Sequence, residues 1–186
     1  MDARQRTRRR AQSACFVLAL TLVCAEDVPK PTGFRAEFLT QLDDVEKKMV
    51  SLAEVMPEDK YSWRPNEGVR SVGQVYVHLA SANFGIPFFL GIKPPAGIDR
   101  DAENKVMSKK EILDMLKASF ENARKTALSI PDSELDKAVK FFGGKMATKR
   151  SVLLLMATHM HEHLGQSIAY ARMNSVVPPW STGKSE

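Results

Sequence analysis

The chain has 186 residues, of which 27 are basic and 22 acidic, and its formal net charge at pH 7 is +5. The excess lies at the N-terminus, because the chain without its first 25 residues keeps 22 basic and 21 acidic residues, a net charge of +1. A body so close to neutral argues against a nucleic-acid partner, which requires a basic surface.

Residues 1–25 have the features of a secretory signal peptide. Five arginines between positions 4 and 10 precede an apolar run, and small side chains follow just before Ala25. The run is shorter than the ~20 apolar residues of a membrane span. We therefore expect cleavage after Ala25, export to the periplasm or the medium, and no membrane attachment of the mature protein. The arginine pairs and Cys24 leave twin-arginine export and lipid attachment open as alternatives.

Both cysteines, Cys15 and Cys24, lie in this N-terminal segment. The mature chain therefore has no disulfide and no cysteine that serves as a nucleophile or a metal ligand. Its fold has to be stabilised by an apolar core, and about 160 residues are enough to bury one.

Two amphipathic helices are expected in the first half of the mature chain. After a short leader, residues 26–32, apolar side chains recur every three or four positions over residues 33–55. The second helix covers residues 72–85. Ser71 can cap it, with Gln74 in the position of a capping box.

A long connection rich in proline and glycine, residues 91–107, follows the second helix. In helical bundles such a connection is typical of a crossover, so the helices on either side of it should run parallel. A second capping box, at Ser108 and Glu111, begins the third helix, which ends before Pro131.

Two short extended runs around Gly143 and Gly144 predict a small hairpin. The fourth helix runs from about residue 148 to residue 174, and residues 152–157 are apolar all round, which predicts the most buried part of the protein. We therefore expect an all-α fold, a four-helix bundle over residues 33–181, with a short tail over residues 182–186.

All four histidines lie in two of these helices. His159 and His163 are one helical turn apart and point to one side, whereas His161 points about 200° away from His159. His78 has apolar neighbours in the second helix, so it faces inward. If the second and fourth helices are adjacent, His78 completes a three-histidine metal site with an open coordination position. The alternative is a core histidine beside a chance pair.

Other residues near these segments have simpler interpretations. We expect Glu162 to be solvated, Gly165 to allow close helix packing, and Gln166 to make a hydrogen bond near the histidines. Trp63 is expected at the edge of the core, and Arg64 is expected to pair with a carboxylate at a helix end.

Three segments together resemble the DinB-like superfamily of metal-binding four-helix bundles. They are residues 61–71 (YSWRPNEGVRS), residues 72–83 (VGQVYVHLASAN), and residues 159–166 (HMHEHLGQ) followed by residues 170–179 (YARMNSVVPP). The resemblance covers the chain from about residue 33 to residue 181. It implies an up-down-down-up bundle with His78, His159 and His163 as the metal ligands. Zinc is the default ion, and nickel, iron and manganese also accept imidazole.

The resemblance implies two kinds of function. Characterised members of the superfamily include thiol-dependent transferases and isomerases, so one expectation is a metal-dependent transferase or hydrolase that acts on an unidentified small molecule. The other is a non-catalytic exported protein that binds a metal or a ligand, alone or as a homodimer. Export favours the second, because cytosolic thiol cofactors are not expected outside the cell membrane. The near-neutral charge does not support a role in DNA repair.

Overall fold

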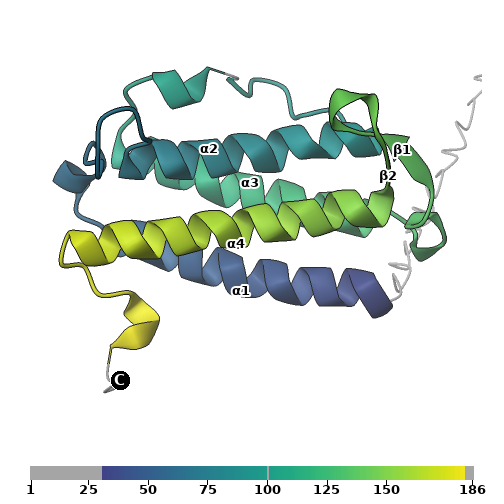
Figure 1. Cartoon of the computed structure of the whole chain (residues 1–186). Coiled ribbons are helices and arrows are strands. Elements are labelled where there is room, and N and C mark those ends of the chain that lie inside the picture. The colour runs from purple at the N-terminus through teal and green to yellow at the C-terminus, as the bar shows by residue number, and fades with distance from the viewer. Residues whose placement is uncertain (1–30, 100, 183–186) are drawn as a thin grey trace, which may run out of the picture.

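The computed structural model describes residues 31–99 and 101–182, and the predicted signal peptide lies outside them. The described residues form a bundle of four helices, as the sequence predicted (Figure 1). These are α1 (Gly33–Val55), α2 (Val72–Gly85), α3 (Lys109–Ser129) and α4 (Lys149–Met173). In this part of the chain, no helix is both long and apolar enough to cross a membrane.

Each helix packs against two others. α2 contacts α3 and α4, and α1 contacts the same two helices from the other side. The connection after α2 passes back over this helix to the start of α3, so that α2 and α3 run parallel and the bundle is up-down-down-up (Figure 1). The connection contains a short 3-10 helix, Ala102–Asn104, that packs on α2.

The predicted capping boxes are both present, and they explain where two of the helices begin. The Ser71 hydroxyl accepts from the backbone N–H of Gln74, and the Gln74 side chain accepts from the backbone N–H of Ser71. Ser108 and Glu111 make the same reciprocal pair at the start of α3. Each box satisfies two backbone donors that a helix otherwise leaves free.

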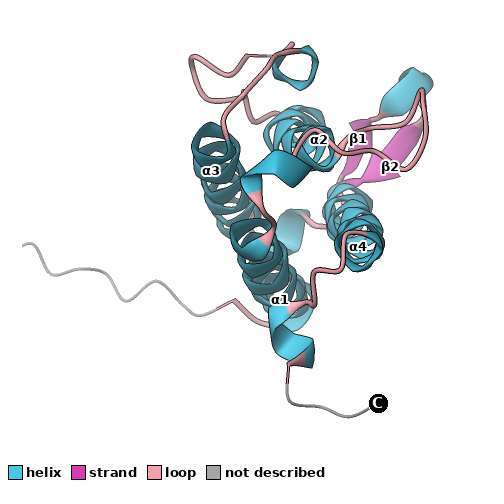
Figure 2. Ribbon diagram, turned by 90° about the vertical axis from the view of Figure 1, so that its left-hand side faces the viewer, coloured by secondary structure: helices cyan, strands magenta, loops and turns pink. Residues whose placement is uncertain are grey.

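The predicted hairpin joins α3 to α4. Its strands, β1 (Ala138–Lys140) and β2 (Met146–Thr148), pair antiparallel with Val139 opposite Ala147. The hairpin lies beside α2 and α4, on the side away from α3 (Figure 2). There it meets the 3-10 helix Ile86–Leu90 that continues α2. Ring centroids of Phe89, Phe141 and Phe142 lie 4.4–4.9 Å apart in this corner.

The core lies between the four helices, and α4 contributes less to it than the sequence predicted. Val152, Leu153 and Met156 are fully buried, but Leu154 is 54% exposed and Leu155 is only half-buried. The prediction that residues 152–157 are the most buried part of the protein is therefore wrong, since residues 72–80 of α2 are more completely buried. α4 packs on α1, α2 and the 3-10 helix after α2, and these neighbours do not cover its whole circumference.

Candidate metal centre

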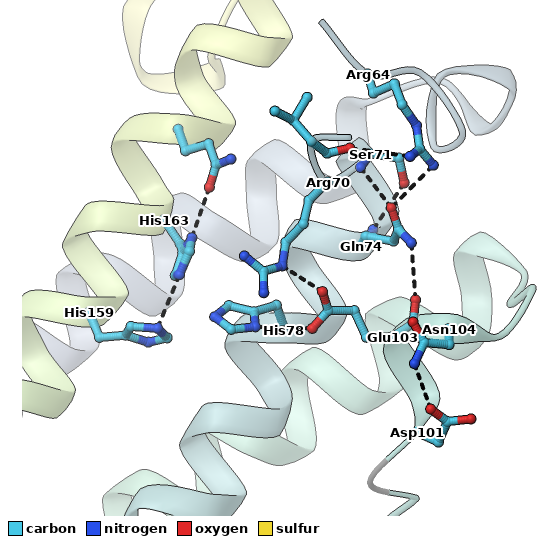
Figure 3. A network of polar contacts seen from close by, with 12 residues as sticks. Arg64, Arg70, Ser71, Gln74, His78, Asp101, Glu103, Asn104, His159 and His163 are labelled. Carbon is cyan, nitrogen blue, oxygen red and sulfur yellow. Dashed lines mark hydrogen bonds and ion pairs between the residues drawn. The ribbon is translucent and has the colours of Figure 1, made fainter. Parts of the chain in front are cut away.

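Three histidines from two helices meet inside the bundle. His78 comes from α2, and His159 and His163 come from successive turns of α4 (Figure 3). One ring nitrogen of each lies within 4.8 Å of the other two. The Nε2 atoms of His159 and His163 are 3.1 Å apart. The ring centroid of His78 lies 5.3 Å from that of His159 and 4.9 Å from that of His163. The structure thus brings together the three histidines that the sequence singled out.

Hydrogen bonds orient two of the three rings. The Nδ1 of His78 donates to Glu103 Oε2 at 3.1 Å, and the Nδ1 of His163 donates to Gln166 Oε1 at 2.9 Å (Figure 3). Because an acceptor oxygen faces Nδ1 in both cases, the proton sits on Nδ1 and the lone pair sits on Nε2. This arrangement leaves Nε2 of His78 and of His163 free to bind a metal ion.

A polar network extends outward from each of these contacts. Arg70 Nε donates to Glu103 Oε1 at 2.5 Å, and Gln74 Nε2 donates to the backbone oxygen of Glu103 at 3.2 Å. On the other side, Gln166 Nε2 donates to the hydroxyl of Tyr170, which donates to the backbone oxygen of Arg70. The network therefore ties the crossover, the start of α2 and the end of α4 to the histidines.

Burial keeps His159 and His163 neutral at neutral pH. The pKa of His159 is lowered to about 4, mainly by burial and in addition by the neighbouring rings of His163 and His78. Burial also lowers the pKa of His163, against the opposing effect of the hydrogen bond to Gln166. Burial alone would raise the pKa of Glu103, but its hydrogen bonds with Arg70 and His78 outweigh this and lower it. At neutral pH the site therefore combines two neutral imidazoles, those of His159 and His163, with the ionised carboxylate of Glu103.

This donor set fits a divalent metal ion. The Nε2 lone pair of His163 points at Nε2 of His159, 3.1 Å away, and Nδ1 of His159 is buried without a hydrogen-bond partner among the described residues. With its proton on Nδ1, His159 turns a second Nε2 lone pair toward the same point, where a cation can bind both. Three imidazoles, one of them hydrogen-bonded to a carboxylate, are a common ligand set for a divalent ion with an open coordination position. Imidazole by itself does not choose among zinc, nickel, iron and manganese.

One side of the cluster is open. His78 and His159 line a cleft of about 1000 Å³, together with residues of α2, the crossover and the hairpin. His163, on the opposite side, is only 6% exposed. An ion held by the three nitrogens would thus be reached from the cleft.

Sequence reasoning missed Glu103 and Arg70. Glu103 lies 25 residues after His78 in the charged crossover, and no local pattern marks it. Only the path of the crossover back over α2 brings it to the histidine.

The remaining expectations had mixed outcomes. Gln166 does make the expected hydrogen bond, to His163. Glu162 is exposed, and Trp63 packs edge-on against Tyr170 at the border of the core. Arg64, however, donates to the backbone oxygen of Val69 and the side chain of Gln74 instead of a carboxylate.

Two predictions for α4 also need correction. A Cβ added at Gly165 would meet nothing within 4 Å, so this glycine does not serve close packing. His161 stays outside the cluster, as expected, but it is half-buried instead of lying on the surface.

Comparison with known proteins identifies the family. The sequence profile of the DinB superfamily matches residues 41–167. The chain belongs to the DinB superfamily. Among curated proteins, none is similar enough to count as a match.

Solved structures of the DinB superfamily share the fold. A DinB-like protein from Bacillus cereus is 20% identical, with a TM-score of 0.68 over 77% of this chain and 95% of its own. A DinB-like protein from Bacillus subtilis is 19% identical, with a TM-score of 0.57 over 77% of this chain and 92% of its own. At this level of identity the likeness concerns the fold alone.

The first prediction concerns Glu103. Replacing Glu103 with Gln removes the charge behind His78, and we expect the affinity for a divalent ion to fall about 10–100-fold. Competition with a fluorescent chelator measures this. Glu121→Gln, which removes a carboxylate from the exposed face of α3, is the matched control and should bind as the wild type does. An unchanged affinity of Glu103→Gln would contradict the assigned role.

The second prediction concerns pH. In the metal-free protein, His159 and His163 stay neutral in the folded state, while the same residues in the unfolded chain take up protons below about pH 6.5. The contribution of these two histidines to the free energy of unfolding should therefore be complete above pH 6.5. It should decline as the pH falls toward 4. Urea titrations at several pH values measure it. The decline should shrink in His159→Gln and persist in His161→Gln, and the reverse order would refute the explanation.

Proposed function

We propose that this protein is a metal-dependent transferase or hydrolase that acts on a small molecule. One observation carries the proposal: the nitrogens of His78, His159 and His163 converge at the end of a large cleft, with two of the three rings in its wall. A purely structural metal site is normally closed by its fourth ligand, whereas a catalytic site keeps one position for a substrate.

The residues of the site suit this role. A divalent ion bound there would act as a Lewis acid toward an oxygen or sulfur atom of the substrate. Glu103 and Gln166 hold the rings of His78 and His163, so that their Nε2 atoms face inward before any ligand arrives. Arg70 in turn holds Glu103 and compensates its charge. Such preorganisation avoids the cost of arranging the ligands during the reaction.

The second candidate is a non-catalytic exported protein that binds a metal or a ligand. It is favoured if the segment after α2 closes over the histidines. Instead, Phe88 and Phe89 of this segment line the wall of the cleft, and the cleft reaches His78 and His159. This supports a metal that is accessible to a ligand over an occluded, purely structural one.

Metal content tests the proposal. We expect the purified mature chain to hold one divalent ion, measured by inductively coupled plasma mass spectrometry after dialysis. His159→Ala should weaken binding at least ~10-fold, since it removes a ligand, and His161→Ala, on the same helix, should not. A wild-type protein without a divalent ion, or equal losses in both variants, would refute the proposal.

We also propose that the mature protein is exported. The arginine-rich and apolar N-terminal segment supports this, with cleavage after Ala25. N-terminal sequencing of the protein recovered from producing cells should give Glu26 as the first residue. An intact N-terminus in the cytoplasmic fraction would refute it.

A further inference from the structure

The floor of the cleft is a stripe of small residues on α2. Ser81, Ala82 and Gly85 follow His78 at three, four and seven positions, so they share its face of the helix, and all four line the cleft. A Cβ added at Gly85 would meet nothing within 4 Å. Because these side chains are short, the space above α2 stays free for about 10 Å beyond the histidine.

The walls of the cleft are apolar. Leu155 lies one turn before His159 on α4, and aromatic rings come from the segment after α2 and from the hairpin. Two of them, Phe88 and Phe142, are 64% and 55% exposed. Exposed aromatic side chains that gather around a concave surface are characteristic of a ligand-binding site.

Charged groups are confined to one rim. Among the described residues that line the cleft, the charged side chains are Lys93 and Asp99, both exposed on the crossover. Asp99 already accepts from Lys105 Nζ at 2.5 Å. The cleft therefore has a polar end at the histidines and an apolar run that extends to Gly85 and the phenylalanines.

We propose that this cleft binds elongated amphiphilic small molecules. A head group with an oxygen or sulfur donor reaches the metal held by the three histidines, and an apolar body about 10 Å long lies along α2 toward the phenylalanines. The inference rests on the proposed metal site for the head group, whereas the apolar run stands on its own geometry. A sugar or nucleotide of the same length would leave its polar groups without partners among the aromatic side chains, at a cost in affinity.

A series of alkyl hydroxamates tests this. The hydroxamate head binds divalent ions, and the chain is lengthened stepwise from acetohydroxamate through butano-, hexano- and octano- to decanohydroxamate. Isothermal titration calorimetry with the zinc-loaded mature protein should show affinity rising by about fourfold per methylene, the value for a buried CH₂ group. The rise should stop once the chain outgrows the ~10 Å run from His78 to Gly85.

A matched pair of variants locates the chain. Gly85→Leu places a side chain in the free space at the far end of the cleft, and Gly165→Leu makes the same change on α4 outside it. We expect Gly85→Leu to keep the wild-type affinity for acetohydroxamate and to lose about tenfold or more for the longest chains. Gly165→Leu should match the wild type throughout. Zinc content and thermal melts verify that both variants are folded and loaded.

The outcomes separate the two proposals. If acetohydroxamate binds only to the zinc-loaded protein and affinity rises with chain length, both stand. If acetohydroxamate binds but longer chains bind no better, or if Gly85→Leu has no effect on them, the amphiphile inference is overturned while the metal site remains. If no hydroxamate binds in a zinc-dependent way, the head-group assignment and the proposed function both fall.

Discussion

The site depends on holding three imidazoles close together inside the bundle, with His159 and His163 uncharged. The Nε2 atoms of His159 and His163 lie 3.1 Å apart, and burial lowers the pKa of both rings, so that neither ring takes up a second proton at neutral pH. Neutral imidazoles offer lone pairs to a cation, so such a cluster is suited to bind one. The cluster also constrains the fold. α2 and α4 have to pack side by side, with His78 at the same level along the bundle as His159 and His163.

The crossover contributes to both the fold and the site. A bundle whose second and third helices run parallel needs a connection that returns along the length of a helix. Here this connection passes over α2, where Glu103 binds His78 and Gln74 anchors the backbone of Glu103. The same segment supplies one wall of the cleft. A shorter link would leave His78 without its carboxylate and the cleft without that wall.

The two sides of the histidine cluster differ in what surrounds them. On the side of Gln166 and Tyr170, a chain of hydrogen bonds closes the structure around His163. On the other side, the small residues of α2 leave a cleft that is also lined by the crossover and the hairpin. This asymmetry gives a bound metal a rigid protein side and a free side, which is what a site that admits a ligand requires.

Much of the fold and part of the site were determined locally by the sequence. Helix lengths followed from the spacing of apolar residues, helix starts from Ser71 and Ser108, and the shared direction of His159 and His163 from the pitch of a helix, because each depends on residues within a turn or two. Only the tertiary structure decided that His78 lies at the right depth, that Glu103 stands behind it, and that Leu154 is exposed while Leu155 faces a cleft. These features depend on which helices pack together and on the path of a long connection, and contacts between distant residues leave no periodic trace in the sequence.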